Sequence, residues 1–144
     1  MTPADLAALH TLCFTHPPPW SAATFANFAT DPLCFTLTEA DSFLIGRVVA
    51  GEAELLTLAV APQNRRRGLG HRLLARFIYQ SRLRAADTAF LEVAATNTAA
   101  IALYTAAGFT RSGLRKGYYR APGHAPIDAI LMSRVLSPAD PPIS

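Results

Sequence analysis

The pattern of apolar and polar positions in the first 60 residues predicts two helices followed by three strands. Thr2 is a suitable helix cap with Pro3 in the first turn, and an apolar stripe continues this helix toward the Pro17-Pro18-Pro19 run. Ser21 can cap a second, shorter helix that ends near Asp31-Pro32. The next apolar segments predict an antiparallel meander of strands over residues 34–38, 43–49 and 54–60, with a turn at 50–52.

The rest of the chain alternates helices with strands. Apolar residues recur at helical spacing from Leu69 to Ile78, and another helix begins near Thr96-Asn97 and ends at Gly108, a good C-terminal stop. Strand patterns cover residues 89–93, 109–114 and 129–135, and an irregular segment with Gly117, Pro122 and Gly123 joins the last two. The order ααβββαβαββ predicts an α/β fold: a mixed sheet with helices on both faces. We expect one domain over residues 1–136 and a flexible, proline-rich tail at 137–144.

Composition narrows the class of protein. The chain has 144 residues, of which 51% are hydrophobic and 16% charged, which suits one folded domain and excludes a disordered protein. No apolar run is long enough for a membrane span, and acidic Asp5 without a basic segment argues against a signal peptide, so we expect a cytoplasmic protein. Cys13 and Cys34 lack C-x-x-C spacing and the four histidines are scattered, so we expect no metal site.

The positive charge is concentrated rather than spread. The net charge is +3 and the pI is about 9.2, which raises the question of nucleic-acid binding. The arginines gather within residues 65–84, however, and no basic stripe is interleaved with aromatic residues. A polyanionic small-molecule ligand explains this distribution more economically.

The run Arg65-Arg66-Arg67-Gly68-Leu69-Gly70 lies where the third strand turns into the following helix. The first N–H groups of a helix have no intrahelical partners and attract anions, and glycine lets a phosphate approach the backbone closely. A Walker A loop is absent, and the dinucleotide fingerprint fails at Leu73. The remaining pattern, R-x-x-G-x-G, predicts a phosphate-binding turn, with an ordinary solvated loop as the alternative.

Two later segments give the chain a resemblance to a known family. Leu91-Glu92-Val93-Ala94-Ala95-Thr96-Asn97, followed by Ala100-Ile101-Ala102-Leu103-Tyr104 and Ala107-Gly108-Phe109, is similar to the L-E-V-x-x-x-N…A-x-x-L-Y…G-F signature of the GNAT superfamily of N-acetyltransferases. In that superfamily R-x-x-G-x-G binds the pyrophosphate of coenzyme A. The Pro19-Trp20-Ser21 triplet, the L-x-x-A-V strand and the Tyr118-Tyr119 pair resemble the ribosomal-protein alanine N-acetyltransferases in particular.

The chain departs from this family pattern in two places. Ala94 stands where the subfamily often has an arginine, which puts an acceptor contact by that side chain in doubt. The chain also begins at the first expected helix, so the first edge strand of the GNAT fold is expected to be missing, leaving a sheet edge without its usual neighbour.

For the cofactor, the resemblance implies acetyl-CoA as co-substrate and no metal. A bulge in the strand that contains Leu58-Ala59-Val60 would leave backbone groups free to pair with the pantetheine arm and to polarise the acetyl carbonyl. Backbone amides from Arg67 to His71 would hold the diphosphate, with one or two of the arginines reaching its oxygens. The cofactor-binding residues implied are Leu58, Ala59, Val60, Arg65, Arg66, Arg67, Gly68, Leu69, Gly70, His71, Asn97 and Tyr104.

For catalysis, the resemblance implies that Glu92 is the general base for the amine and that Tyr104 is the general acid for the leaving thiolate. Taken alone, Glu92 fits an exposed position on a half-solvated strand, and Tyr104 fits a core aromatic. Asn97 is expected to cap its helix and to contact pantetheine. The residues expected at the acceptor are Trp20, which also fits a core position, Glu92, and Tyr118 and Tyr119 in a loop between the final strands.

The function implied by the resemblance is acetyl transfer by direct attack of an amine in a ternary complex. The acceptor is expected to be a protein or peptide N-terminal α-amine of the ribosomal-protein alanine type. A small-molecule amine such as a polyamine or an antibiotic, and a coenzyme A-binding sensor without catalysis, remain as alternatives. We expect a monomer or weak dimer that binds neither nucleic acid nor membrane.

Overall fold

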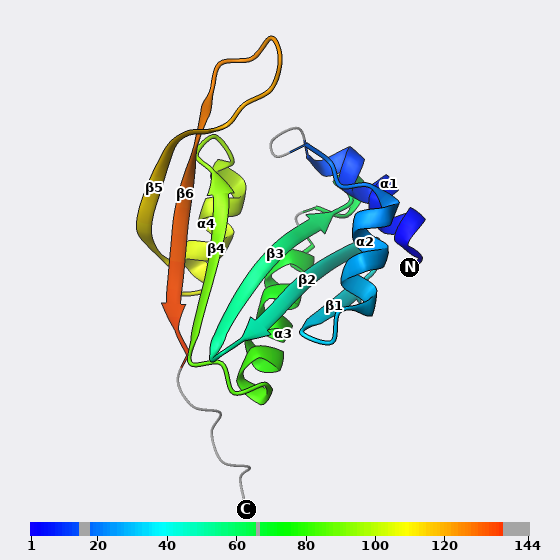
Figure 1. Cartoon of the computed structure of the whole chain (residues 1–144), viewed down its shortest axis with the longest axis vertical. Coiled ribbons are helices and arrows are strands. Elements are labelled where there is room, and N and C mark those ends of the chain that lie inside the picture. The colour runs from blue at the N-terminus through cyan, green and yellow to red at the C-terminus, as the bar shows by residue number, and fades with distance from the viewer. Residues whose placement is uncertain (15–17, 66, 137–144) are drawn as a thin grey trace, which may run out of the picture.

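A six-stranded mixed sheet with helices on both faces forms the part of the chain that the computed structural model describes, residues 1–14, 18–65 and 67–136 (Figure 1). The observed order confirms the predicted ααβββαβαββ arrangement. Pro17, Arg66 and the tail at 137–144, for which the sequence made predictions, lie outside these residues. The elements are α1 (Pro3–Cys13), α2 (Ala22–Thr30), β1 (Cys34–Glu39), β2 (Ser42–Val49), β3 (Glu52–Val60), the 3₁₀ helix η1 (Pro62–Asn64), α3 (Leu69–Leu83), β4 (Thr88–Ala94), α4 (Thr98–Ala106), β5 (Thr110–Tyr119) and β6 (Ile127–Val135).

Side-chain caps fix the starts of three helices, as the sequence predicted. Thr2 and Asp5 form a reciprocal capping box at the start of α1, and the Ser21 hydroxyl accepts the Thr24 N–H at the start of α2. The Asn97 side chain accepts the Ala100 N–H at 3.1 Å and caps α4. Each cap satisfies one N–H that the helix leaves free and stabilises the helix by about 1 kcal/mol.

The sheet opens between its two central strands. The strand order is β1-β2-β3-β4-β6-β5, and β3 and β4 are parallel neighbours. They pair only where Glu52–Glu54 lie beside Thr88–Phe90, and beyond these residues the two strands separate. Figure 1 shows the resulting gap between β3 and β4, which widens toward the C-terminal ends of both strands.

A bulge in β3 lies at the edge of this gap. Ile45 of β2 is opposite Thr57, and Gly46 is opposite Leu55, so Leu56 is an extra residue without a partner. The bulge reverses the alternation of side chains: Leu55 packs with the core on the α3 side, whereas Leu56 packs on the α1 side and Thr57 bonds to α1. The bulge expected in the Leu58-Ala59-Val60 segment therefore lies two residues earlier, at Leu56.

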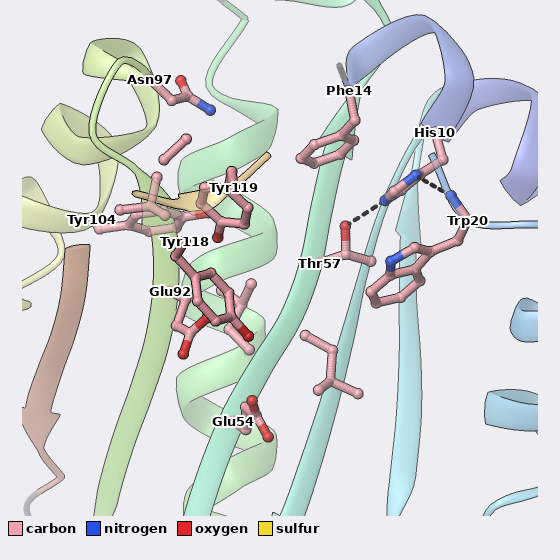
Figure 2. A pocket seen from close by; sticks show the side chains of 14 residues that line it. His10, Phe14, Trp20, Glu54, Thr57, Glu92, Asn97, Tyr104, Tyr118 and Tyr119 are labelled. Atoms are coloured by element: carbon pink, nitrogen blue, oxygen red, sulfur yellow. Dashed lines mark hydrogen bonds between the residues drawn. The ribbon is translucent and has the colours of Figure 1, made fainter. Parts of the chain in front are cut away.

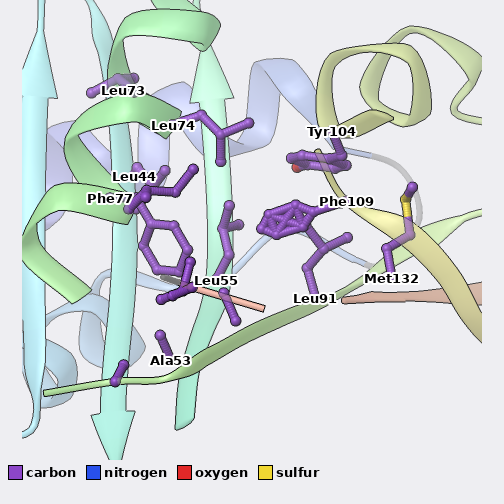
Figure 3. Packing of buried hydrophobic residues seen from close by; sticks show 14 of the residues in the cluster. Leu44, Ala53, Leu55, Leu73, Leu74, Phe77, Leu91, Tyr104, Phe109 and Met132 are labelled. Carbon is purple, nitrogen blue, oxygen red and sulfur yellow. The ribbon is translucent and has the colours of Figure 1, made fainter. Parts of the chain in front are cut away.

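Two layers of core cover the two faces of the sheet. On one face, α3 buries Leu73, Leu74 and Phe77 completely against the sheet, and Leu91 and Phe109 complete this layer (Figure 3). Full burial of each such side chain contributes about 1.5–3 kcal/mol. On the other face, α1 and α2 pack over β2 and β3 through Leu6, Leu9, Phe25, Phe43, Ile45, Ala59 and Ala61.

The final hairpin, formed by β5 and β6, differs from the prediction. The sequence predicted that the penultimate strand ends at residue 114 and that Tyr118 and Tyr119 lie in a loop, but β5 continues to Tyr119. The strand includes a second irregularity, between Arg115 and Tyr119, at which Gly117 adopts a left-handed φ of 57° and donates its N–H to Asp128 Oδ1 at 2.8 Å. This irregular pairing allows a segment with loop-like composition to remain in the sheet.

The opposite edge of the described sheet is β1. The helix α3 covers part of this edge. The Arg76 guanidinium donates to the Thr38 carbonyl at 2.8 Å and pairs with Glu39 at 3.3 Å. A main-chain acceptor on the outer strand is thereby satisfied by a charged side chain, which makes the edge less available to other strands.

Candidate active site

A cavity of about 290 Å³ occupies the gap between β3 and β4 (Figure 2). We call it the gap cavity. Its walls come from four regions that are distant in sequence: α1 with the segment after it, β3, β4 with the start of α4, and the end of β5. The lining residues are His10, Phe14, Trp20, Glu54, Leu55, Leu56, Thr57, Glu92, Val93, Ala94, Asn97, Tyr104, Tyr118 and Tyr119.

Glu92 is the carboxylate that β4 presents to the gap cavity. Leu91 and Val93 point into the core, so strand alternation turns Glu92 to the opposite face, where its side chain is 28% exposed. Arg115 of β5 lies with Nε 3.4 Å from Glu92 Oε1. This pairing holds the carboxylate in position while leaving it accessible from the cavity.

Tyr104 reaches the same cavity from α4. The side chain is 6% exposed and packs edge-on against Phe109, so it is also part of the core. Burial, and to a smaller extent the neighbouring Tyr119, raises the pKa of the Tyr104 phenol. The hydroxyl therefore keeps its proton at neutral pH and can donate it.

The pair Tyr118 and Tyr119 closes the cavity from β5. Their rings meet edge to face at 5.3 Å, and the Arg115 guanidinium lies 5.2 Å from the centre of the Tyr118 ring. Burial, followed by the nearby charges of Glu92 and Tyr118, raises the pKa of Tyr119 to about 12. The hydroxyls of Tyr104 and Tyr119 are therefore protonated. Both can donate hydrogen bonds in the cavity that the Glu92 carboxylate also lines.

His10 is a cavity residue that the sequence interpretation missed. It is 1% exposed, and its ring stacks with Phe14 at 4.2 Å and with Trp20 at 5.1 Å. The Trp20 backbone N–H donates to Nδ1 at 3.0 Å, and Nε2 lies 3.0 Å from Thr57 Oγ1 (Figure 2). Burial lowers the pKa of His10 to about 4, so the ring is neutral. A lone histidine on a helix gives no sequence signal for this role, because its partners come from distant segments.

A second cavity, of about 770 Å³, lies at the N-terminus of α3, and we call it the helix cavity. Asn97 lines both cavities, so the two spaces meet at the start of α4. Seven of its lining residues were predicted to bind the cofactor: Val60, Arg65, Gly68, Leu69, Gly70, His71 and Asn97. The sequence interpretation missed Cys13, Asn64, Thr96, Ala99, Ala100 and Leu103.

The start of α3 offers free N–H groups to the helix cavity. The first backbone hydrogen bond of α3 runs from Arg72 N to Gly68 O, and no side chain caps the helix. The preceding N–H groups of Leu69, Gly70 and His71 therefore have no intrahelical acceptor. Gly68 has a left-handed φ of 75°, which favours glycine at this turn. Uncapped donors at the positive end of a helix fit a diphosphate group.

The sequence interpretation attributed the arginines of residues 65–84 to a polyanionic ligand. The structure places only some of them at the helix cavity. Arg65 lines it and donates from Nε to Val60 O at 3.2 Å, while Arg67 is exposed. Arg72 and Arg76 pair instead with Glu39 of β1, and the Arg84 guanidinium stacks 4.6 Å from the centre of the Phe35 ring. Part of the positive charge of residues 65–84 thus stabilises the contact between α3 and β1.

Among the remaining predicted residues, Leu58 and Ala59 are not among the lining residues of either cavity, and Trp20 lines the gap cavity only. Leu58 packs partly into the core on the α3 side, and Ala59 is buried on the α1 side, so only their backbone groups remain for a ligand. Trp20 packs with the α1 and α2 core and also lines the gap cavity, so its core position is confirmed and its contact with the acceptor stays a prediction. Cys13 and Cys34 are free and half-buried.

The sequence matches the acetyltransferase (GNAT) family over residues 5–109, which is more than half of the chain. The chain belongs to the GNAT family of acetyltransferases. This confirms the predicted family, the fold and an N-acetyltransferase activity. Asn97 lines both the gap cavity and the helix cavity, so the two candidate binding spaces are adjacent.

Similar proteins within the family have a named acceptor. The chain is 43% identical over 127 residues to the ribosomal protein bS18-alanine N-acetyltransferase of Salmonella typhimurium, with 85% of this chain and 84% of that protein covered. The Escherichia coli K12 enzyme of the same name is 41% identical over 135 residues, with 91% and 90% covered. The crystal structure of the ribosomal-protein-S18-alanine N-acetyltransferase from Escherichia coli superimposes with a TM-score of 0.83 at 34% identity, covering 99% of this chain and 92% of that chain.

Within residues 1–14, 18–65 and 67–136, no group of three or more histidine, cysteine, aspartate or glutamate side chains is placed to hold a metal ion. In the same residues, no helix has both the length and the apolar character needed to cross a membrane.

Proposed function

We propose that this enzyme transfers the acetyl group of acetyl-CoA to the N-terminal α-amine of a protein, of the ribosomal-protein alanine type. The observation that carries the proposal is the gap between β3 and β4, where a carboxylate and a protonated phenol face one cavity beside a second cavity with free helical N–H groups. The acceptor class follows from the named relatives, which are similar along most of both chains.

The residues of the helix cavity fit the coenzyme A part of the donor. Leu69, Gly70 and His71 would bind the diphosphate through backbone N–H groups, and Arg65 would add positive charge. The free edge of β3 beyond Glu54 offers main-chain groups to the amides of the pantetheine arm, in the manner of an added strand. This arrangement directs the thioester toward the junction of the two cavities near Asn97.

In the proposed reaction, Glu92 accepts a proton from the acceptor ammonium, directly or through a water. The free amine then attacks the thioester carbonyl carbon, so that a C–N bond forms while the C–S bond breaks. The nitrogen of the new amide passes its excess proton through water to the phenolate that remains when Tyr104 protonates the sulfur. Tyr104 donates its proton to the departing thiolate sulfur, and burial favours the protonated phenol that this step needs. No covalent acetyl-enzyme is required, since both substrates are held together in one site.

The acceptor would enter from the open side of the gap cavity. Tyr118 and Tyr119 on one side and Trp20 on the other would provide aromatic walls for a small apolar side chain, and Glu92, beside the two tyrosines, would bind the α-ammonium. An acceptor of the ribosomal-protein type, as named for the relatives, supports a cytoplasmic location. The enzyme is proposed to act as a monomer or weak dimer.

A turnover screen tests the acceptor class. The purified enzyme is incubated with acetyl-CoA and with alanine-initiated peptides, the same peptides blocked by N-terminal acetylation, polyamines or aminoglycosides, and thiol release and product mass are measured. We expect activity on the free peptides and none on the blocked ones. Activity on polyamines or aminoglycosides alone would assign a small-molecule acceptor, and binding of acetyl-CoA without turnover of any amine would assign a sensor.

A further inference from the structure

The Thr57 side chain reaches the gap cavity because of the bulge at Leu56. With regular alternation after Leu55, residue 57 would point toward α3 and the main core. The extra residue in β3 turns Thr57 to the α1 face instead, where it lines the gap cavity and is 5% exposed. Bulges beside active sites commonly redirect one side chain in this way.

His10 determines the hydrogen-bonding state of the Thr57 hydroxyl. A backbone N–H is always a donor, so the contact from Trp20 N makes Nδ1 of His10 the acceptor. In a neutral ring the proton then resides on Nε2, which donates to Thr57 Oγ1 at 3.0 Å. The Thr57 oxygen is an acceptor in this contact, and its own hydrogen remains to be donated elsewhere.

That hydroxyl hydrogen has no acceptor within the protein as described. The contact with His10 is the only hydrogen bond of the Thr57 side chain among residues 1–14, 18–65 and 67–136. Nearly buried donors are almost always satisfied, so a donor without a partner at the wall of a cavity indicates a ligand atom that accepts. Extended peptide inserted into this cavity brings backbone carbonyl oxygens that lose water and need donors.

We propose that Thr57 is an acceptor-binding residue whose hydroxyl, oriented by His10, donates a hydrogen bond to a backbone carbonyl oxygen of the acceptor peptide. This inference rests on the proposed N-terminal acetylation. Figure 2 shows Thr57 and His10 on the β3 side of the cavity, across from Glu92 and the tyrosine pair. The acceptor would thus be held at its amine by one wall and at a carbonyl by the other. His10 acts through Thr57 and is a positioning residue.

The test compares Thr57→Val, which keeps the shape and removes the donor, with Thr57→Ser, which keeps the donor. Steady-state kinetics on an alanine-initiated peptide should show an acceptor KM raised about 3- to 10-fold in Thr57→Val, which corresponds to the loss of one neutral hydrogen bond. We expect kcat and the acetyl-CoA Kd to be nearly unchanged, and Thr57→Ser to restore most of the affinity. Thr36→Val, the same change on the exposed face of β1, is the matched control and should behave as wild type.

Substrate changes identify the contacted carbonyl. Each of the first three peptide carbonyls is replaced in turn by a thioamide, a weaker hydrogen-bond acceptor, and KM is measured with wild type and Thr57→Val. One thioamide should raise KM for the wild type but not for the variant. His10→Phe retains an aromatic ring without either hydrogen bond; it should raise KM to a similar extent, and the double variant should be no worse than either single one.

Several outcomes would overturn the inference. They are an unchanged acceptor KM in Thr57→Val, equal KM values for the valine and serine variants, or a change in acetyl-CoA Kd in place of acceptor KM. Thermal denaturation checks that each variant folds, and if His10→Phe does not, the Thr57 pair and the thioamide series decide alone. If wild type acetylates no peptide, the proposed function fails and this inference fails with it. If wild type is active and Thr57→Val matches it, only this inference fails.

Discussion

At the scale of single residues, the proposed chemistry depends on two side chains that approach one cavity from different elements. Glu92 is presented by β4 and held by Arg115, whereas Tyr104 is buried in α4 and keeps its proton. The sequence alone also allowed a purely structural interpretation: Glu92 as an exposed strand residue and Tyr104 as a core aromatic. The structural interpretation is correct as far as it goes, since Glu92 is partly exposed and Tyr104 is in the core. The structure shows in addition that both side chains line the gap cavity.

Removal of either proton-transfer group should slow turnover without weakening donor binding. We expect Glu92→Gln and Tyr104→Phe each to lower kcat by about 10²-fold or more, because general acid or base catalysis typically contributes that much. The acetyl-CoA Kd, measured by calorimetry, should stay close to that of wild type. Glu52→Gln, a change at an exposed carboxylate of the same sheet, is the control. A variant that retains full turnover would remove its residue from the mechanism.

At the scale of elements, the start of α3 lines the helix cavity and the bulged part of β3 lines the gap cavity, so each contributes to one half of the proposed site. The sequence located the turn before α3 correctly, because the glycines and arginines are adjacent in the chain, and its binding of a diphosphate stays a prediction. The sequence placed the bulge two residues too late, because the position of the extra residue depends on how β3 pairs with β2. The same limit applies to Tyr118 and Tyr119, whose strand is defined by pairing with β6 and by the Gly117 contact with Asp128.

A negative charge at the start of α3 should abolish donor binding. Gly70→Asp places a carboxylate among the free N–H groups of the helix cavity, where it would repel and replace a diphosphate. Its Cβ would lie 3.1 Å from the flexible end of Leu103, so the fold should tolerate the change. Calorimetry should detect no acetyl-CoA binding, whereas Ala75→Asp, on the exposed side of the same helix, should bind normally. Normal affinity in Gly70→Asp would contradict the assigned diphosphate site.

Gly46 of β2 lies opposite the bulge in β3 and packs closely against two aromatic rings. A Cβ on Gly46 would lie 2.6 Å from Phe35 Cζ and 2.9 Å from the Phe77 ring, so Gly46→Ala should lower the free energy of unfolding by about 1–3 kcal/mol. Gly123→Ala is the control, because nothing lies within 4 Å of its Cβ and only its left-handed φ of 78° opposes alanine, at about 1–2 kcal/mol. Chemical denaturation measures both. A smaller loss in Gly46→Ala than in Gly123→Ala would indicate that the two aromatic rings move aside easily.

At the scale of the whole molecule, His10 connects stability to the site. The α1–α2 layer covers β2 and β3, and the His10 ring lies between that layer and the bulged strand, bonded to Trp20 and Thr57. The sequence predicted the two helices but not this contact, because it joins residues 47 positions apart. The order of the elements follows from local patterns, while the walls of the gap cavity are set by contacts between distant segments.

The free energy of unfolding should fall as the pH is lowered from about 6.5 to about 4. The unfolded chain binds a proton at His10 below its ordinary pKa of 6.5, whereas burial keeps the folded ring neutral down to about 4. The unfolded state therefore gains the proton first, and stability falls by about 1.4 kcal/mol per pH unit in this window. Denaturation at several pH values should give a steeper dependence for wild type than for His10→Phe. Parallel curves would show that His10 does not contribute.

The separation of β3 and β4 also affects how the protein avoids unwanted association. Open strand edges commonly attract strands of other chains and lead to aggregation. Here the two edges beyond Glu54 and Phe90 face each other inside one molecule, across a cavity of about 290 Å³ walled by aromatic side chains. A single extended chain end fits such a space, but a folded sheet does not. The proposed peptide acceptor would thus reach main-chain groups that stay inaccessible to other folded proteins.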